Sequence, residues 1–566
     1  MTSTPNGYRC AHSASALTAR FGPEAFELTV GDHRLGWSLS GLGIGEEIQP
    51  VGAGVTTATA NRMEYARRGV VEWYVNGPLG LQHGFNVPHR PDPAAAGALV
   101  LELALRGSLA AQVDHDGRGL AFTPPDGPVA VRYTGLTAFD AAGRTLPARF
   151  RLVAGRLQIC VQDANARYPV VVDPLFETAT LSSTTGSSSA GFGDAVAISG
   201  DTIVVGAPGT SSPTGGPQGL VYVFEKPPYG WATMTETATL RAPAPLLFGS
   251  FGAAVDIAGD TIVVGDPLRG APLMDGAVFV FEKPPGGWVD ATATVQLTPS
   301  AITTGQQFGT SVATDGTIIA VGAPDKTLGT TTPGAVFVFE RPPLGWVSAT
   351  ETATLTASDG TVGMGLGASV ALDQRWIVAG APDADDGRDE RVGAAYVFEA
   401  FERGWRTSTE VAKLSASNGM PGDRFGLAAS MDGDIVVTGG GQAYVFAARL
   451  RGWATRTETA ILRASDAGAA EGFGESVAIA GGAVLVGASA VDVGSVQDQG
   501  AVYVFSRLDR GWRTATETLK VTAAAGSPFS RFGAAVAIDG RSVVVGARNA
   551  SVPGRIGLGA AHVFVR

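Results

Sequence analysis

The chain has 566 residues, among them 78 glycines and 33 prolines, and a formal net charge of −11. This length exceeds one ordinary domain, so two domains are expected. The acidic balance and the scattered arginines give nucleic acid no electrostatic footprint, and no apolar run reaches the roughly 20 residues of a membrane helix. High glycine with only 16% charged residues is typical of a turn-rich, all-β protein.

Residues 1–174 show strand patterns without a repeat. Short apolar or alternating runs separated by turn signals predict strands at 26–30, 34–39, 70–75, 98–105, 129–133, 157–161 and 168–172. A β-sandwich-like domain is the expectation for this many short strands. We place its end at Asp173-Pro174, because the residue before a proline is held extended. Segments 64–87 and 168–174 resemble a domain that precedes repeats in large bacterial surface proteins, a resemblance that implies no chemistry.

Cysteine and histidine give this N-terminal part no predicted site. Cys10 and Cys160 are the only cysteines, and the sequence is compatible with one disulfide or with two separate thiols. Five of the six histidines lie here, yet none forms an H-x-H or H-x-x-x-H pair of the kind that metal sites use. The first 20 residues are polar and lack the apolar core of a secretory signal peptide.

The rest of the chain, residues 175–566, is a repeat. A Phe-Gly or Leu-Gly pair recurs at intervals of about 58 residues, with one shorter interval, which is the range of solenoids, propellers and arrays. The anchors of the seven copies are Phe192, Phe251, Phe308, Leu366, Phe425, Phe473 and Phe532. The alternating and β-branched runs of the first copy predict four strands, at 194–198, 202–205, 220–225 and 236–240. Each copy is therefore predicted to be a four-stranded antiparallel meander.

Such a sheet has apolar residues on both faces and needs neighbours on both sides. Radial packing of seven sheets into a β-propeller supplies them, and a linear solenoid is the alternative. The two ends of the repeat region favour the propeller. The last copy stops at its third strand, 562–566, while 177–181, Glu-Thr-Ala-Thr-Leu, matches the fourth strand at 236–240. We therefore predict a seven-bladed β-propeller closed by an N-terminal strand.

The recurring motifs resemble the FG-GAP repeat of integrin α-subunit propellers and bacterial surface proteins. Besides the Phe-Gly pairs, Gly-Ala-Pro occurs at 206–208, 322–324 and 380–382, with a Gly-Asp-Pro variant at 265–267. The resemblance implies a ligand-binding face made by the loops after Gly-Ala-Pro and those leading into each first strand. It also implies binding rather than catalysis, and a place outside the cell or on its surface.

Calcium is a second point that the resemblance raises. Many members of the family carry a D-x-D-x-D-G loop between the first and second strands. Here that loop is only two or three residues with one carboxylate, as in Ser199-Gly200-Asp201, whereas Ca²⁺ takes about six to eight oxygens. We expect no calcium site of the family type, and no cofactor. A weaker cation candidate is the acidic loop 383–390, with Asp383, Asp385 and Asp389, for which a solvated loop is the alternative.

The loops after Gly-Ala-Pro are the predicted ligand contacts. Their aspartates give the candidates Asp266, Asp325, Asp383, Asp385, Asp389 and Asp492. The fifth copy, Thr438-Gly439-Gly440-Gly441, has almost no loop and predicts a notch suited to docking. A tryptophan follows glycine before each of six fourth strands, at positions 231, 288, 346, 405, 453 and 512. We expect these indoles to pack between sheets with a partner for each N–H, and sugar stacking is the alternative.

Taken together, these patterns predict an extracytoplasmic binding or adhesion protein that presents propeller loops to a protein or glycan. The oligomeric state is left open, and no catalytic residue is identified. A glycan hydrolase or lyase would need two carboxylates about 5 to 9.5 Å apart, which a sequence does not place. A structural module of a surface assembly is the third possibility.

Overall fold

The computed structural model describes residues 2–565 with gaps, and it contains no helix in the described residues. The gaps are 5–6, 12–16, 23–24, 31–32, 60–61, 78–79, 115–116, 118, 126–130, 142–145, 176–178, 186–188, 212–217, 228–230, 232, 244–248, 271–273, 386–390, 450–451, 467–470, 494–495, 508–510, 518, 524–525, 541 and 553–554. Accordingly, no described helix could cross a membrane.

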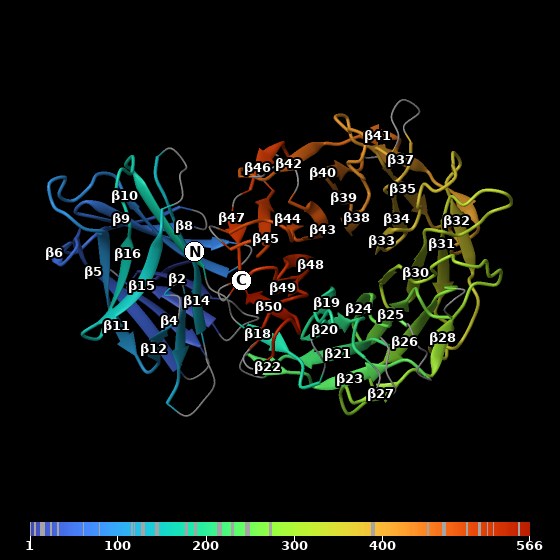
Figure 1. The fold of residues 1–566 in the computed structure, drawn as a ribbon, viewed down its shortest axis with the longest axis horizontal. Coiled ribbons are helices and arrows are strands. Elements are labelled where there is room, and N and C mark those ends of the chain that lie inside the picture. Colours follow the sequence, from blue (N-terminus) through green and yellow to red (C-terminus); the bar gives the residue numbers. More distant parts are fainter. Residues whose placement is uncertain are drawn as a thin grey trace.

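The first seventeen strands form two antiparallel sheets at one end of the molecule (Figure 1). The larger sheet has the order β1-β2-β3-β4-β5-β11-β16-β15, with β6 beside β5, and the other has the order β12-β13-β14-β17-β10-β9-β8-β7. The strands of the larger sheet are β1 (Thr2–Thr4), β2 (Gly7–Ala11), β3 (Leu17–Phe21), β4 (Phe26–Val30), β5 (His33–Ile44), β6 (Glu47–Pro50), β11 (Leu99–Gly107), β15 (Ala148–Val153) and β16 (Arg156–Val161). Those of the other sheet are β7 (Val55–Thr59), β8 (Arg62–Arg67), β9 (Val70–Gly77), β10 (Gly80–Val87), β12 (Ala110–Val113), β13 (Leu120–Thr123), β14 (Val131–Phe139) and β17 (Val170–Leu175).

The two N-terminal sheets share one apolar core. Leu101 and Ile159 of the larger sheet and Tyr74 and Val172 of the other belong to the same cluster of buried side chains. The strand order also answers the disulfide question. Cys10 lies on β2 and Cys160 on β16, with β3, β4, β5 and β11 between them, whereas a disulfide needs Cα atoms within about 7 Å. Cys160 is accordingly a buried free thiol.

The repeat region forms seven further sheets, numbered here in chain order. Sheet 1 has β19 (Ala195–Ser199), β20 (Thr202–Ala207), β21 (Leu220–Glu225) and β23 (Ala238–Arg241); sheet 2 has β24 (Ala254–Ala258), β25 (Thr261–Asp266), β26 (Ala277–Glu282) and β28 (Val295–Leu297). Sheet 3 has β29 (Ser311–Thr314), β30 (Ile318–Ala323), β31 (Ala335–Glu340) and β32 (Ala353–Thr356); sheet 4 has β33 (Ser369–Asp373), β34 (Trp376–Ala381), β35 (Ala394–Glu399) and β37 (Ala412–Ser415). Sheet 5 has β38 (Ala428–Asp432), β39 (Ile435–Gly440), β40 (Gln442–Ala447) and β42 (Ala460–Arg463); sheet 6 has β43 (Phe473–Ala480), β44 (Ala483–Ala488), β45 (Ala501–Ser506) and β47 (Leu519–Val521). Sheet 7 has β48 (Phe532–Asp539), β49 (Ser542–Ala547), β50 (Ala560–Val565) and β18 (Ala179–Ser182).

The second strands are buried along their whole length because a neighbouring sheet covers each face. Every residue of β20, Thr-Ile-Val-Val-Gly-Ala, is buried, and β44 and β49 are buried in the same way. Continuous β-branched runs suit a strand covered on both faces. The apolar clusters accordingly lie between sheets, as where Val204 of sheet 1 and Val264 of sheet 2 share one cluster.

Five of the sheets gain a fifth strand that the sequence did not predict. A two-residue segment ahead of one outer strand pairs in parallel with the outer strand of the sheet before it. These segments are β22 (Met234–Thr235), β27 (Ala291–Thr292), β36 (Ser408–Thr409), β41 (Arg456–Thr457) and β46 (Ala515–Thr516). Each outer edge is thereby covered, which is one way that proteins protect exposed strand edges.

The motif glycines stand where neighbouring sheets come closest. A Cβ on Gly206 of sheet 1 would lie 2.0 Å from the carbonyl oxygen of Gly252, the glycine of the next Phe-Gly pair. Only a residue without a side chain permits this approach. The same contact recurs at every junction, as Gly265–Gly309, Gly322–Gly367, Gly380–Gly426, Gly439–Gly474, Gly487–Gly533 and Gly546–Gly193.

The last sheet is joined to the first in the same manner as the others. β18 pairs with β50, with Ala179 opposite Val563, and so supplies the fourth strand of sheet 7. The first strand of each sheet contacts the first strand of the next, and β48 of sheet 7 contacts β19 of sheet 1. Gly200 of sheet 1 donates its N–H to Asp539 of sheet 7 at 2.5 Å. Figure 1 shows the seven sheets in chain order around a common centre.

Candidate functional site

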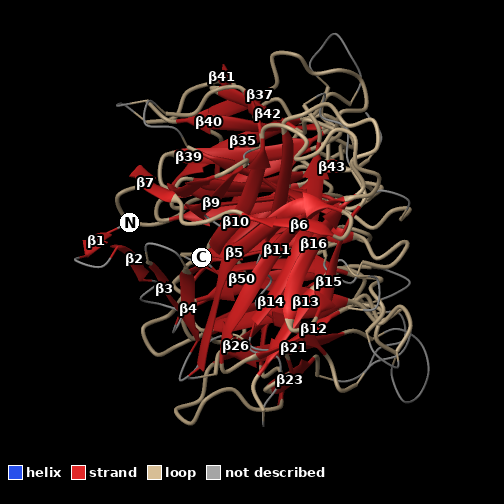
Figure 2. Ribbon diagram, turned by 90° about the vertical axis from the view of Figure 1, so that its left-hand side faces the viewer, coloured by secondary structure: helices blue, strands red, loops and turns tan. Residues whose placement is uncertain are grey.

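One end of the seven sheets carries the long connections. Because consecutive strands are antiparallel, the loops between second and third strands and those leading into each first strand emerge at the same end. We call this end the loop face, and Figure 2 shows the loops gathered mainly on one side of the molecule. Sheet 5 is the exception, because Gly440 and Gln442 pair directly and only Gly441 lies between β39 and β40.

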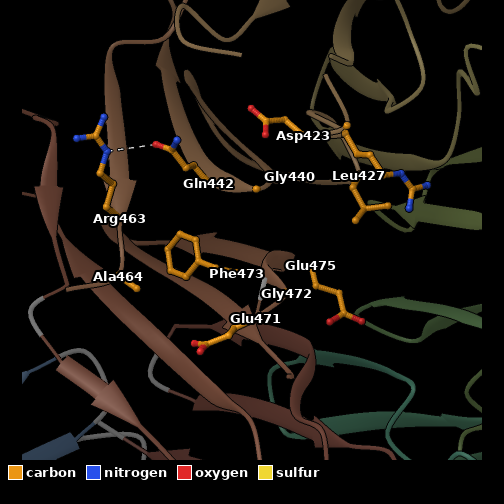
Figure 3. Close-up of a pocket in the computed structure, with 13 residues that line it drawn as sticks. Asp423, Leu427, Gly440, Gln442, Arg463, Ala464, Glu471, Gly472, Phe473 and Glu475 are labelled. Carbon is orange, nitrogen blue, oxygen red and sulfur yellow. Dashed lines mark hydrogen bonds between the residues drawn. The ribbon is translucent and has the colours of Figure 1, made fainter. Parts of the chain in front are cut away.

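This missing loop leaves a hollow, which we call the sheet 5 cavity (Figure 3). Its volume is about 560 Å³, within the range typical of small-molecule sites. It lies over the short hairpin of sheet 5, between the segments that lead into sheets 5 and 6. Its walls come from four separate stretches, and the residues that line it are Gly422, Asp423, Arg424, Leu427, Gly440, Gly441, Gln442, Arg463, Ala464, Glu471, Gly472, Phe473 and Glu475.

Glycine makes the tight hairpin possible. Gly440 and Gly441 have φ values of +136° and +62°, a region that residues with a side chain rarely adopt. A Cβ on Gly440 would also lie 2.3 Å from the carbonyl oxygen of Arg424. These two glycines therefore lower the floor of the cavity and bring the segment that contains Arg424 against it.

The polar side chains of the cavity carry both signs of charge. Arg463 donates from Nε to Oε1 of Gln442 at 3.2 Å, and Figure 3 shows this pair above the ring of Phe473. Asp423 accepts the N–H of Met420 at 2.8 Å, which holds its carboxylate at the rim. Among the described residues, the Glu471 carboxylate has no hydrogen-bond or ion-pair partner.

Two of the charged groups connect the cavity to its surroundings. Arg424 places Nε 3.9 Å from the carboxylate of Asp383, in the loop of sheet 4. Glu475 accepts from the Ser489 hydroxyl at 2.5 Å and lies 3.9 Å from the Arg548 guanidinium, which also pairs with Asp194 at 3.2 Å. Charged residues are thus paired across three junctions of the loop face, between sheets 4 and 5, 6 and 7, and 7 and 1. The cavity lies at the junction of sheets 5 and 6, where the described residues form no such pair.

The predicted aspartates of sheets 3 and 4 lie on the loop face. Asp383 reaches the edge of the cavity through Arg424. Asp325 accepts from the Gln307 side chain, and its pKa is raised because partial burial and the charge of Asp383 outweigh that hydrogen bond. These two carboxylates therefore act on one another. Asp385 accepts the N–H of Arg391 at 3.1 Å and so holds its own loop.

The remaining candidates play other parts. Asp266, predicted as a ligand contact, is 1% exposed and accepts from the backbone N–H of Ser250 at 2.7 Å, so in this structure it fixes the segment that leads into sheet 2. Burial raises its pKa, although Ser250 and Arg269 lower it. Asp492 accepts the N–H of Asp498 at 2.8 Å within one loop. Asp389 lies outside the described residues. Within the described part, no three His, Cys, Asp or Glu side chains form a group that could hold a metal.

The six repeated tryptophans lie inside the structure. All are buried, and each belongs to an apolar cluster between two sheets, as Trp231 does between sheets 7 and 1. Packing between sheets is therefore confirmed. The described residues offer no acceptor to five of the indoles, since the Nε1 atoms of Trp231, Trp288, Trp346, Trp453 and Trp512 are buried without one.

Sequence patterns located the notch but missed the side chains that line it. Arg463 is the last residue of the outer strand β42. Phe473 is the anchor of the next copy, Glu471 and Glu475 lie on either side of it, and all of them are far from the short loop along the chain. The sequence did hold one signal for Glu475. Of the seven Phe-Gly or Leu-Gly anchors, only two are followed directly by an acidic residue, which is Glu475 in one copy and Asp194 in another. Without the packing of sheets 5 and 6, nothing related those positions to the notch.

Comparison with protein families gives one match. A model described as the FG-GAP repeat matches residues 175–224, 292–339, 349–398, 408–446, 456–505 and 515–564. Each matched stretch begins near an outer strand and runs through the first three strands of the following sheet. The stretch without a match contains sheet 2, where Gly265-Asp266-Pro267 replaces Gly-Ala-Pro. No curated protein matches the chain in sequence.

Proposed function

Since the chain belongs to the FG-GAP repeat family, we propose that residues 175–566 form a seven-bladed β-propeller, closed by β18, that binds a protein or glycan on its loop face. The contacts at all seven junctions between neighbouring sheets support this proposal. The same glycine contact joins every pair of neighbouring sheets, and sheet 7 meets sheet 1 through it as well. A rigid ring of this kind is a suitable scaffold for binding loops.

The sheet 5 cavity is the observation that carries the proposed binding. It is concave, lies on the loop face, and combines the Phe473 ring with carboxylate, guanidinium and amide groups. Binding sites commonly join apolar walls to a few polar groups that fix orientation. Arginines and carboxylates in one cavity suit a ligand that both donates and accepts hydrogen bonds, as peptide groups and sugar hydroxyls do.

The proposal extends to the rest of the chain. Residues 1–174 form a β-sandwich-like domain in which two antiparallel sheets enclose the shared core. The last strand of this domain, β17, ends at Leu175, and β18 begins at Ala179, so the boundary between the domains lies near 175. We assign the protein to the cell surface or the extracellular space, as the FG-GAP repeats suggest.

The test is binding of the purified full chain to an array of glycans and extracellular proteins. The cavity variant carries Arg463→Ala with Glu471→Ala, which removes one group of each sign. The control variant carries Glu402→Ala with Arg403→Ala, two exposed residues in the connection after β35, at the opposite end of the sheets. We expect a ligand that the wild-type and the control bind equally and the cavity variant binds at least about tenfold more weakly.

Two other outcomes would contradict the proposal in different ways. If all three proteins bind one ligand equally, the cavity is not its site and binding belongs to another surface. If no arrayed molecule binds, the surface-assembly module becomes the better account of the chain. Repeating the assay with a calcium chelator tests the acidic loop at Asp383 and Asp385. If a cation binds there and supports ligand binding, the chelator lowers the binding.

A further inference from the structure

A three-residue polar contact recurs in sheets 4 and 6. In the turn that leads into sheet 4, Asp359 accepts from the Tyr396 hydroxyl at 2.8 Å and from Lys413 Nζ at 2.6 Å. The equivalent contact in sheet 6 joins Asp466 to Tyr503 at 2.8 Å and to Lys520 at 2.5 Å. The carboxylate thus satisfies the tyrosine hydroxyl and balances the lysine charge.

Sheet 5, which lies between these two, has a different set. Asn418 stands in the position of the aspartate, Tyr444 keeps the tyrosine, and Ile461 replaces the lysine. The Tyr444 side chain is fully buried, and its hydroxyl and the Asn418 Oδ1 atom are both buried with no hydrogen-bond partner in the described part of the chain. Leaving buried polar atoms without partners is unfavourable, so this arrangement is a weak point of the sheet.

The residue after Asn418 is Gly419. In an Asn-Gly pair the missing Cβ leaves the glycine nitrogen free to reach the asparagine side chain, and asparagine is among the chemically labile residues of proteins. The local hydrogen bonds leave this nitrogen available. Gly360 of the equivalent turn donates its N–H to Ala357 at 3.3 Å, whereas Gly419 N–H has no acceptor among the described residues.

We propose that Asn418 is a site of spontaneous deamidation, and that the aspartate formed there accepts the hydrogen bond of the Tyr444 hydroxyl. The Gly419 nitrogen forms a bond to Cγ of Asn418, the Cγ–Nδ2 bond breaks, and Nδ2 leaves as ammonia with the proton from the attacking nitrogen. Water then opens the succinimide ring. Hydrolysis at Cγ gives aspartate and restores the main chain, whereas hydrolysis at the other carbonyl gives isoaspartate.

The aspartate product reproduces a contact that the protein already makes twice. It keeps the main-chain length that places Asp359 and Asp466 against their tyrosines, which isoaspartate does not. The reaction also affects the sheet 5 cavity. The segment that follows Asn418 supplies Gly422, Asp423 and Arg424 to its wall, so deamidation adds a negative charge beside a wall that already contains Asp423.

The test is peptide mass mapping of the full chain after incubation in a mildly alkaline buffer. We expect conversion at Asn418 at least about tenfold faster than at Asn76, followed by Gly77, because the β9–β10 pairing holds that pair extended. The variant Asn418→Gln controls for peptide assignment. Equal rates at the two sites, or conversion at Asn418 only after unfolding in denaturant, would overturn the proposal.

A double-mutant cycle tests the second half of the proposal, which is the hydrogen bond between the new aspartate and the Tyr444 hydroxyl. Asn418→Asp supplies the product directly, and its effect on the thermal midpoint is measured with Tyr444 and with Tyr444→Phe. We expect Asn418→Asp to be more favourable with the tyrosine than with the phenylalanine, because only the tyrosine donates a hydrogen bond to the new carboxylate. The same shift in both backgrounds, or a product that is isoaspartate alone, would show that the contact does not form.

Discussion

At the scale of single residues, glycine decides how close the sheets can come. The Cβ that alanine would add at Gly546 would lie 2.0 Å from the carbonyl oxygen of Gly193, in the contact between sheets 7 and 1. Atoms do not approach to this distance, so the two sheets would have to separate. The glycines of the Phe-Gly and Gly-Ala-Pro motifs are thus required because the backbones of neighbouring sheets touch there, apart from any role in binding.

We predict that Gly546→Ala lowers the free energy of unfolding by about 1 to 3 kcal/mol, the usual cost of overpacking. The matched control is Gly286→Ala, because a Cβ there would meet nothing within 4 Å and the backbone φ is an ordinary one. Denaturant midpoints of the two variants and the wild type are the measurement. If both variants shift equally, the close approach at Gly546 is not the cause.

A second residue-scale feature is a buried charged cluster in the N-terminal domain. Glu72 accepts from the Tyr74 hydroxyl at 2.8 Å and lies 3.2 Å from His83 Nε2, while His83 Nδ1 is 2.6 Å from the Tyr133 hydroxyl. These contacts fit a neutral imidazole whose Nε2 donates to the carboxylate and whose Nδ1 accepts from the tyrosine. Burial lowers the pKa of His83, although Glu72 raises it.

The sign of the resulting pH effect follows from that direction. Below the ordinary histidine value of 6.5, the unfolded chain takes up a proton that native His83 does not, so stability falls as the pH falls through this range. For Glu72, burial raises the pKa, but contacts with His83 and Arg67 outweigh burial and lower it. Its contribution is therefore present above the ordinary glutamate value of 4.5 and is lost at lower pH.

We predict that His83→Gln flattens the pH dependence of stability just below 6.5, whatever its effect on the absolute stability. Urea unfolding of the full chain at a series of pH values, with the N-terminal domain followed by the hydrogen exchange of its own peptides, gives the profile. His89→Gln, at an exposed histidine, is the control and keeps the wild-type slope. A His83→Gln profile with an unchanged slope would contradict the assignment of a neutral native imidazole.

At the scale of elements, a glutamate clasp links neighbouring outer strands. Glu410, just ahead of β37, accepts from both the backbone N–H and the hydroxyl of Ser358, which follows β32 of the sheet before it, at 2.9 and 2.6 Å. The same clasp joins Glu236 to Thr184, Glu351 to Ser300, Glu458 to Ser417 and Glu517 to Ser465. The clasps stand beside the short parallel strands, so both features hold the rim together.

We predict that Glu410→Ala lowers the free energy of unfolding by about 1 kcal/mol, since the clasp is a charge-assisted hydrogen bond at an exposed site. The double variant with Ser358→Ala provides the control. If the clasp is the cause, the loss in the double variant is smaller than the sum of the two single losses. Strictly additive losses would mean that the side chains act separately.

At the scale of the whole molecule, the proposed ring is held at one place by the non-covalent pairing of distant segments. Ala179 of β18 faces Val563 of β50, and the equivalent pair in sheet 1 is Val223 and Ala238. All four residues are buried. The two pairs have the same register, but the first spans nearly the whole repeat region and the second spans one connection.

We predict that a disulfide from Ala179→Cys with Val563→Cys stabilises the protein by about 3 kcal/mol more than one from Val223→Cys with Ala238→Cys, because loop entropy grows with loop length. Both are made with Cys10→Ser and Cys160→Ala, and thermal unfolding is compared with and without reductant. Failure of the bond between positions 179 and 563 to form, while the bond between positions 223 and 238 forms, would argue against a pairing that joins the ends of the ring.

The sequence by itself determined the repeat, its number of copies and most third strands, because these depend on local pattern. Predicted strands 26–30 and 220–225 coincide with β4 and β21. It missed β10, whose Gly-Leu-Gln-His-Gly-Phe-Asn-Val lacks a β-branched run, and the two-residue parallel strands, which are too short to show a period. The notch at sheet 5 could also be predicted, since the sequence itself shows that the fifth copy lacks the long loop.

Only the tertiary structure decided which side chains line that notch. Asp423, Arg463 and Glu471 come from separate stretches of the chain, and the packing of neighbouring sheets brings them into one cavity. The tertiary structure also places Asp266, a candidate ligand contact, in a buried position against Ser250. Local propensity acts over a few residues, whereas the chemistry of a surface depends on which distant residues the ring places side by side.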